Sequence, residues 1–170
     1  MEQPPRTSPG TPGNPAGPEA DPDAGTLGVR RPARPLHLNP TYVAIVVLGG
    51  IPGALGRWWV GAALPAPGGW PLATLVVNLA GAFALGVLLE ALARRGPDRG
   101  GLRVARLLAG TGFIGAFTTY STFAVDADRL LGSGLALEGL GYVAATILGG
   151  AAASGAGIWA AAYHHARSTR

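Results

Sequence analysis

The chain has 170 residues, about the length of one domain. Of these, 48% are hydrophobic and only 13% are charged; there are 28 glycines, 15 prolines and no cysteine, and the formal net charge is +4. The small charged share excludes a single soluble globular domain. The lack of cysteine excludes a disulfide framework and any cysteine-based metal or redox site.

The basic residues point to a membrane rather than to nucleic acid. All 13 of them are arginines. Most stand beside apolar segments, as the cytoplasmic arginines of membrane proteins do. The chain has no basic stripe interleaved with aromatic residues, so we exclude nucleic acid as a partner.

The first 38 residues differ in composition from the rest of the chain. Ten of the 15 prolines lie at or before Pro40, and aromatic and β-branched residues are almost absent there. Such a segment buries too little apolar area to offset its ordering entropy, so we predict a disordered tail over residues 1–38. It is not a secretory signal peptide, because it lacks a basic start followed by an apolar run. A membrane unit is predicted over residues 39–166, and a basic tail over residues 167–170.

The chain after Pro40 divides into four apolar stretches, each near the ~20 residues that cross a bilayer. A soluble four-helix bundle would carry a polar face on every helix, and these stretches carry almost none. We therefore predict an all-α membrane protein of the cell membrane with four transmembrane helices. Their approximate residue ranges are 41–64, 72–93, 104–125 and 137–163.

The arginines also predict one fixed orientation. The connection after the first stretch carries no basic residue. The connection after the third carries only Arg129, near two aspartates. By the positive-inside rule, both termini and the middle connection face the cytoplasm. The arginines that support this orientation are Arg30, Arg31, Arg34, Arg94, Arg95, Arg99, Arg103, Arg106, Arg167 and Arg170.

Small residues recur along the stretches and indicate close helix packing. Gly49 and Gly53 form a GxxxG pair in the first stretch. Gly149, Ala153 and Gly157 form a small-xxx-small row in the fourth. Such rows let helices approach closely, but they identify no function.

Polar groups at membrane depth are costly and tend to be functional. Arg57 lies in the last third of the first stretch, and either extends to the outer interface or stands at the mouth of an anion path. Asn78 lies in the second stretch with Thr74 one turn earlier. Its amide either donates to an anion or joins two helices by a hydrogen bond.

The third stretch makes a poor mid-membrane helix. Its centre reads GFIGAFTTYSTF over residues 112–123 and holds two glycines and four Ser/Thr hydroxyls. A break is expected here, because hydroxyls and a neighbouring chain can satisfy the freed backbone groups. Carbonyls turned inward at such a break can coordinate a cation such as Na⁺. In the fourth stretch, Tyr142, Thr146 and Ser154 lie roughly along one face and extend a polar track.

Acidic residues are missing from the middle of every stretch. Glu90 and Asp126 lie near stretch ends. Proton-coupled carriers usually need an ionisable relay within the bilayer, so a channel or passive path is favoured over a proton antiporter. His37, His164 and His165 lie in the flanks, and no set of nucleophile and base is recognisable. We therefore predict that the protein is not an enzyme.

Three blocks of the sequence resemble the Fluc/CrcB family of fluoride channels. They read GGIPGALGRWW, ATLVVNLAGAFALG and TGFIGAFTTYSTFAVD, within about residues 41–165. The resemblance implies a fluoride-specific channel that lowers cytoplasmic fluoride by passive export. It also implies an antiparallel dimer of four-helix subunits with two pores and a structural sodium ion at its centre.

The resemblance also implies roles for particular residues. Tyr120 and Phe123 match the two pore aromatics, and Gly115 and Thr118 match the positions whose carbonyls bind the structural Na⁺. The remaining residues implied to line the fluoride pore are Asn78, Ser121, Thr122, Arg57, Thr74, Tyr142, Thr146 and Ser154. The chain departs from the family pattern at Tyr120, where Phe is usual, and at Asp126, where Glu is usual.

The unbalanced arginines add a hypothesis about the partner. A chain that forms an antiparallel homodimer inserts in both orientations and needs nearly balanced flanks. This chain is unbalanced, so we expect it to pair with a homologous subunit of opposite orientation, with a homodimer as the alternative. Two other functions stay open. One is a non-conducting scaffold partner, because Tyr120 departs from the usual pore phenylalanine. The other is a small four-span antiporter. Such an antiporter is expected to carry a glutamate in its first span, and this chain has none there.

Overall fold

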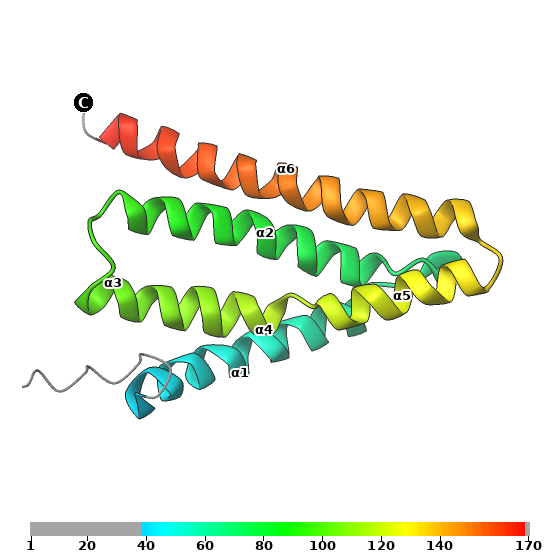
Figure 1. Cartoon of the computed structure of the whole chain (residues 1–170), viewed down its shortest axis with the longest axis horizontal. Coiled ribbons are helices and arrows are strands. Elements are labelled where there is room, and N and C mark those ends of the chain that lie inside the picture. The colour runs from blue at the N-terminus through cyan, green and yellow to red at the C-terminus, as the bar shows by residue number, and fades with distance from the viewer. Residues whose placement is uncertain (1–38, 169–170) are drawn as a thin grey trace, which may run out of the picture. The chain divides into compact units, whose positions relative to one another are not determined.

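The structure of the chain is a computed structural model that describes residues 39–168. Within that range it contains helices and no strand (Figure 1). The disordered tail predicted over residues 1–38, and the last two residues of the predicted basic tail, lie outside the described residues. The elements are α1 Pro40–Ala63, the short η2 Pro67–Gly69, α2 Leu72–Ala93, α3 Gly100–Ala105, the π-helical η3 Arg106–Ile114, α4 Gly115–Phe117, α5 Tyr120–Gly132 and α6 Ala136–Ser168.

Three of these helices are long and apolar enough to cross a membrane: α1, α2 and α6. At about 1.5 Å of rise per residue, the 33 residues of α6 extend about 50 Å, beyond the ~30 Å hydrocarbon core. Because α6 ends at Ser168, it includes Arg167, the first residue of the predicted basic tail. The all-helical fold fits the predicted membrane protein, and the four-span count stays a prediction.

The third apolar stretch is not one continuous helix. A nine-residue π-helical segment follows α3, and the helical backbone then stops after Phe117. Thr118 and Thr119 are extended, with φ/ψ of −79/162 and −150/120. α5 starts at Tyr120, and the side chain of Thr119 accepts a hydrogen bond from the Thr122 amide at its N-terminus. The break that the glycines and hydroxyls predict is thus present at Thr118–Thr119.

The π-helical segment was not predicted, and glycine contacts with α1 accompany it. A Cβ on Gly49 would collide with the carbonyl of Leu108, and one on Gly53 with the carbonyl of Phe113. From the other side, a Cβ on Gly112 would meet the carbonyl of Val46 at 2.6 Å. The GxxxG pair of α1 therefore lets its backbone touch the backbone of η3, as the sequence indicates for close helix packing.

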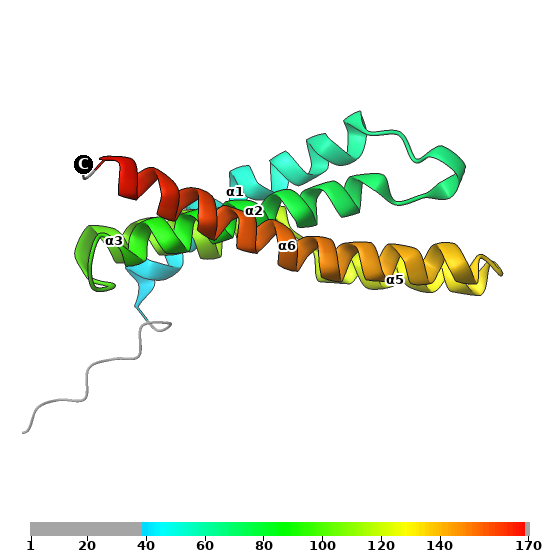
Figure 2. The ribbon, with the colours of Figure 1, turned by 90° about the horizontal axis from the view of Figure 1, so that it is seen from above.

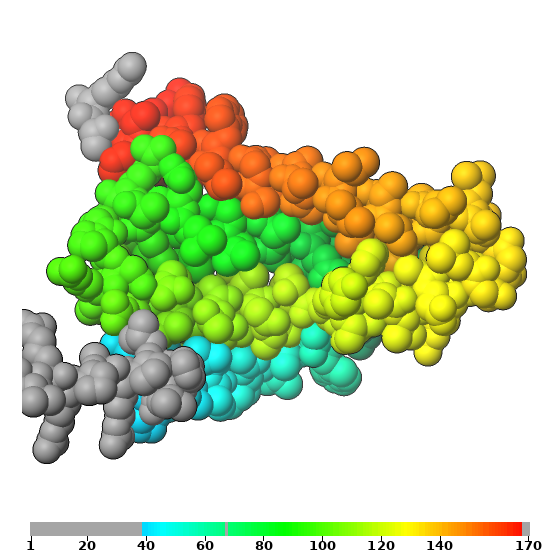
Figure 3. Space-filling model, in the orientation of Figure 1, coloured from blue at the N-terminus to red at the C-terminus, as the bar shows by residue number. Residues whose placement is uncertain are grey.

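A second close crossing joins α2 and α6, the helix pair with the most extensive contact (Figure 3). A Cβ on Gly86 of α2 would collide with the carbonyl of Ser154, and one on Gly157 of α6 with the carbonyl of Phe83. Gly149 lies beside Leu79, where a Cβ would make ordinary contact at 3.4 Å. Of the predicted small-residue row, Gly157 is thus the position that requires glycine.

Most arginines of the described residues lie at one end of the helices. The C-terminal ends of α2 and α6, the start of α3 and the start of α1 lie at one end of the helices, and the α5–α6 connection lies at the other (Figures 1 and 2). Hydrogen bonds from Arg106 hold the pKa of the Asp98 carboxyl at the first end below its usual value. The arginines of the described helices at this end are Arg94, Arg95, Arg99, Arg103, Arg106 and Arg167.

Gly157→Ala tests the α2–α6 crossing. Because the new Cβ collides with backbone, the helices must move apart, and we expect destabilisation of about 1–3 kcal/mol, the usual effect of overpacking. Thermal unfolding in detergent measures it. Gly155→Ala on the same helix is the control, since a Cβ there meets nothing within 4 Å. Equal unfolding midpoints for the two variants contradict the crossing.

Candidate functional site

Asn78 of α2 holds the two extended residues of the break. Its Oδ1 accepts a hydrogen bond from the Thr119 amide at 2.9 Å, and its Nδ2 donates to the Thr119 carbonyl at 3.0 Å. The side-chain amide thus replaces the helical partners that Thr119 lacks. Of the two alternatives for Asn78, the hydrogen bond between helices is present. One Nδ2 proton remains for another acceptor.

Arg57 of α1 binds the same break from another side. Its Nη1 donates to the carbonyl of Thr118 at 3.2 Å in partly buried surroundings. The guanidinium therefore bonds the break rather than extending freely to the outer interface. Two elements distant in sequence, α1 and α2, fix the two consecutive residues Thr118 and Thr119.

The carbonyls predicted to bind sodium lack their usual helical donors. In a continuous α-helix, the amide of residue 119 donates to the carbonyl of Gly115 and the amide of residue 122 to that of Thr118. Here the first amide donates to Asn78, and the second donates to the Thr119 hydroxyl at 3.2 Å. Backbone oxygens released in this way suit a hard cation such as Na⁺. The Gly115 carbonyl is released in this way, whereas the Thr118 carbonyl has exchanged its helical donor for Arg57 Nη1 at 3.2 Å. Gly115 thus fits the predicted ligand set, and Thr118 fits it only if Arg57 gives up this hydrogen bond.

Most threonine hydroxyls around the break have already committed their single proton. A hydroxyl donates one hydrogen bond, so such a group meets a further ligand only as an acceptor unless it rotates. Of the predicted pore residues, Thr74 and Thr146 are occupied in this way. The four donations are Thr74 to Asp126 Oδ2 at 2.8 Å, Thr118 to the Ile114 carbonyl at 2.9 Å, Thr119 to Thr122 Oγ1 at 2.9 Å and Thr146 to the Tyr142 carbonyl at 2.8 Å.

A row of aromatic rings leads from the break into the protein. The Tyr120 and Phe123 ring centroids are 6.0 Å apart, and those of Phe123 and Tyr142 are 5.5 Å apart. Trp70 meets Tyr142 edge-on at 6.0 Å. Tyr142 of α6 is fully buried, and in the described part of the chain its hydroxyl forms no hydrogen bond of good geometry, with the Thr74 and Thr146 hydroxyls as its polar neighbours. Because buried polar groups are rarely left unpaired, this hydroxyl is a candidate ligand group.

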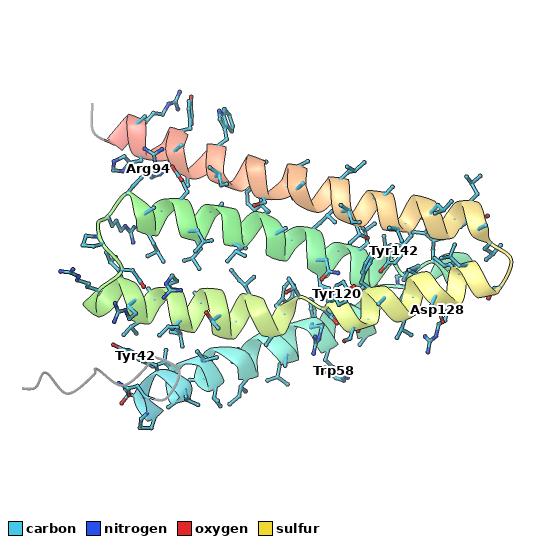
Figure 4. The ribbon with its side chains drawn as sticks, in the orientation of Figure 1. Tyr42, Trp58, Arg94, Tyr120, Asp128 and Tyr142 are labelled. Carbon is cyan, nitrogen blue, oxygen red and sulfur yellow. The ribbon has the colours of Figure 1, made fainter. Side chains whose placement is uncertain are left out.

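A cavity of about 500 Å³ opens beside the break, and Tyr120 is one of its lining residues (Figure 4 labels Tyr120). Tyr120 is 81% exposed, so the cavity is open on that side of the subunit. Of the predicted pore residues, four line it: Asn78, Tyr120, Phe123 and Thr146. The other six do not: Arg57, Thr74, Ser121, Thr122, Tyr142 and Ser154. The carbonyl of Ser154 lies instead against Gly86. The cavity is lined by Asn78, Thr118, Thr119, Tyr120, Phe123, Ala127, Val143, Thr146 and Ile147.

Two residues of the site received little or no weight in the sequence analysis. Asp126 accepts the Thr74 hydrogen bond, and Trp70 packs on Tyr142. The signal for Asp126 was its spacing, because it follows Phe123 by three residues and so shares a helix face with it. Trp70 lies in the connection before α2, where nothing local in the sequence indicates a contact with α6.

These features define an all-helical membrane protein with a polar site at an interrupted helix. A family model described as "CrcB-like protein, Camphor Resistance (CrcB)" matches residues 44–158. Because the match covers more than half of the chain, the chain belongs to the CrcB family. The matched range contains the break, Asn78, Arg57 and the aromatic row.

Individual relatives agree with the family assignment. "Fluoride-specific ion channel FluC 2" of Leifsonia xyli subsp. xyli is 49% identical over 129 residues, which are 76% of this chain and 89% of that protein. "Fluoride-specific ion channel FluC 1" of Cutibacterium acnes is 44% identical over 117 residues, 68% of this chain and 82% of that protein. "Fluoride-specific ion channel FluC 2" of Nocardia farcinica is 41% identical over 134 residues, 76% of this chain and 94% of that protein.

Asn78→Leu tests whether this side chain holds the break. The substitution leaves the amide and carbonyl of Thr119 unpaired, and we expect a loss of about 2–4 kcal/mol of stability. Asn78→Asp keeps the acceptor but loses the donor, so its loss is smaller. The free energy of unfolding in detergent measures both.

Thr146→Val is the matched control for Asn78→Leu. It also replaces a polar residue that lines the cavity, but its hydroxyl donates to a carbonyl of its own helix rather than to the backbone of the break. We expect a change of about 1 kcal/mol or less. If Asn78→Leu is no more destabilising than Thr146→Val, the Asn78 hydrogen bonds do not stabilise the break.

Proposed function

We propose that the chain is a subunit of a fluoride-specific ion channel that lowers cytoplasmic fluoride by passive export across the cell membrane. The observation that carries the proposal is the cavity at the break, where Asn78 and the aromatic pair Tyr120–Phe123 meet on one wall. Its support is the family membership of the chain and the printed names of the relatives. The protein acts as a conduit and not as an enzyme.

The groups at the cavity suit a small, strongly hydrated anion. Asn78 retains one N–H, and the edges of the Tyr120 and Phe123 rings carry partial positive charge. The Tyr142 ring packs on Phe123 at 5.5 Å but does not line the cavity, so we propose that its hydroxyl becomes a further donor only where the path continues past Phe123. Among the described residues no lysine or arginine lines the cavity, and the nearby Arg57 directs its guanidinium to the Thr118 carbonyl. Donors without a fixed positive charge replace hydration water yet let the ion leave, as conduction requires.

The pore is completed by a second subunit in the proposed assembly. The cavity is open where Tyr120 is exposed, and an antiparallel partner packed there covers it. The same packing brings the carbonyls of Gly115 and Thr118 to those of the partner, so that together they hold a structural Na⁺ at the dimer centre. Bound there, the ion neutralises the inward carbonyls and joins the two breaks. Its role is structural, and fluoride passes elsewhere.

The partner is a homologous subunit of opposite orientation. The arginines of the α2–α3 connection, of α3 and η3 and of the last turn of α6 gather at one end of the helices, which supports insertion with that end and both termini in the cytoplasm. A subunit held in one orientation forms an antiparallel pair only with a chain inserted the other way. A homodimer requires that this chain insert in both orientations.

Phe123→Ile tests whether the aromatic row conducts. Loss of the ring edge removes an interaction of about 1.4 kcal/mol, so we expect fluoride efflux from proteoliposomes to fall about tenfold. Phe83→Ile is the control, since Phe83 is an exposed aromatic of α2 outside the cavity. If efflux of the folded complex is the same for both variants, this subunit is a non-conducting scaffold partner.

Tyr142→Phe sharpens the same test. Because the hydroxyl forms no hydrogen bond of good geometry in the described residues, its removal is expected to change the unfolding midpoint little. Fluoride efflux should nevertheless fall, because a donor to the ion is lost. Unchanged efflux at unchanged stability removes Tyr142 from the pathway.

A further inference from the structure

A second hollow, of about 510 Å³, lies between α2 and α6 at the arginine-rich end. Its floor is apolar and consists of Val87, Ala91, Ala160 and Ala161. The hollow lies just beyond the crossing at Gly86 and Gly157, where the two backbones touch. The alanines fill little space, so the interhelical surface past the crossing remains open.

The rim of the hollow is basic. Arg94 and Arg95 reach it from the end of α2, and His164 and His165 from the last turns of α6 (Figure 4 labels Arg94). Glu90 pairs with Arg94 and offsets that charge. In the described part of the chain no carboxylate forms an ion pair with Arg95, which keeps its charge for a ligand. Arg167 lies one turn further on, over the Tyr163 ring at 4.6 Å.

We propose that this hollow binds one anionic phospholipid, with its phosphate at Arg95 and an acyl chain on the alanine floor. Charge complementarity supports this occupant, since the hollow combines a basic rim with an apolar floor between two membrane-length helices. Basic pockets between transmembrane helices on the cytoplasmic side suit anionic headgroups. A soluble phosphate makes no apolar contact with the alanine floor. A zwitterionic lipid has no net negative charge and is attracted less strongly by the arginines of the rim.

The site is separate from the proposed fluoride pathway. None of its lining residues lines the cavity at the helix break. Its proposed effect is to occupy the α2–α6 surface at the cytoplasmic end. A failure of the lipid experiment therefore leaves the proposed channel function standing.

Native mass spectrometry of the full-length protein in detergent tests the proposal. The protein is incubated with phosphatidylglycerol or with phosphatidylcholine of the same acyl chains, and retained lipid is counted. We expect selective retention of phosphatidylglycerol. Arg95→Gln should weaken that retention about fivefold, the usual effect of one basic residue at a lipid surface. Glycerol 3-phosphate, which has the headgroup but no acyl chain, should not displace the lipid.

Arg99→Gln is the matched control. It removes the same charge at the same end, but from the connection between α2 and α3, outside the hollow. We expect its retention of phosphatidylglycerol to equal that of the unaltered protein. Equal weakening by both variants, or equal retention of the two lipids, overturns the proposal. Displacement by glycerol 3-phosphate overturns it as well, by indicating a soluble phosphate site.

Discussion

The two hydrogen bonds between Asn78 and the backbone of Thr119 are the interaction on which the rest of the site depends. Unpaired backbone groups at membrane depth cost several kcal/mol each, so a helix breaks there only where other groups satisfy them. Asn78 does so for both polar groups of Thr119. Its amide oxygen accepts the hydrogen bond from the Thr119 amide, which in a continuous helix would go to the Gly115 carbonyl. The Gly115 carbonyl is thereby left without its helical donor. The start of α5, which positions Tyr120 and Phe123, follows from the same break.

Several hydroxyls near the break already donate their one hydrogen bond within the protein, so fewer groups are left to donate to the proposed anion. A stretch rich in threonines suggests a path lined with hydroxyl donors, yet Thr74 and Thr146 direct their protons to Asp126 and to a carbonyl. Thr74 thereby fixes the Asp126 carboxylate, and Thr146 bonds the backbone of its own helix. What remains at the break is an amide proton of Asn78, aromatic ring edges and the unpaired hydroxyl of Tyr142. In the proposed channel, a path with so few strong donors holds an anion weakly enough to release it.

The sequence predicted those features that depend on local composition. The glycines and hydroxyls around Thr118 predicted the break, and the GxxxG pair at Gly49 predicted a close crossing, because both follow from what single residues permit. The π-helical segment and the bond from Thr74 to Asp126 were not predicted. They depend on contacts between residues far apart in the chain, 52 positions for the latter pair. The sequence also left Arg57 between two roles, and its hydrogen bond to the Thr118 carbonyl was not among them, because it depends on a contact 61 positions away.

The central claim is that this chain provides a fluoride-selective passive path at its interrupted helix. The most direct measurement is ion efflux from proteoliposomes loaded with fluoride or chloride, prepared with this chain alone and with a homologous subunit of opposite orientation. The account predicts fluoride efflux without any imposed proton gradient, far faster than chloride efflux, in the preparation that contains the complete antiparallel pair. Absence of fluoride efflux from well-folded protein in both preparations, or equal efflux of the two ions, contradicts it.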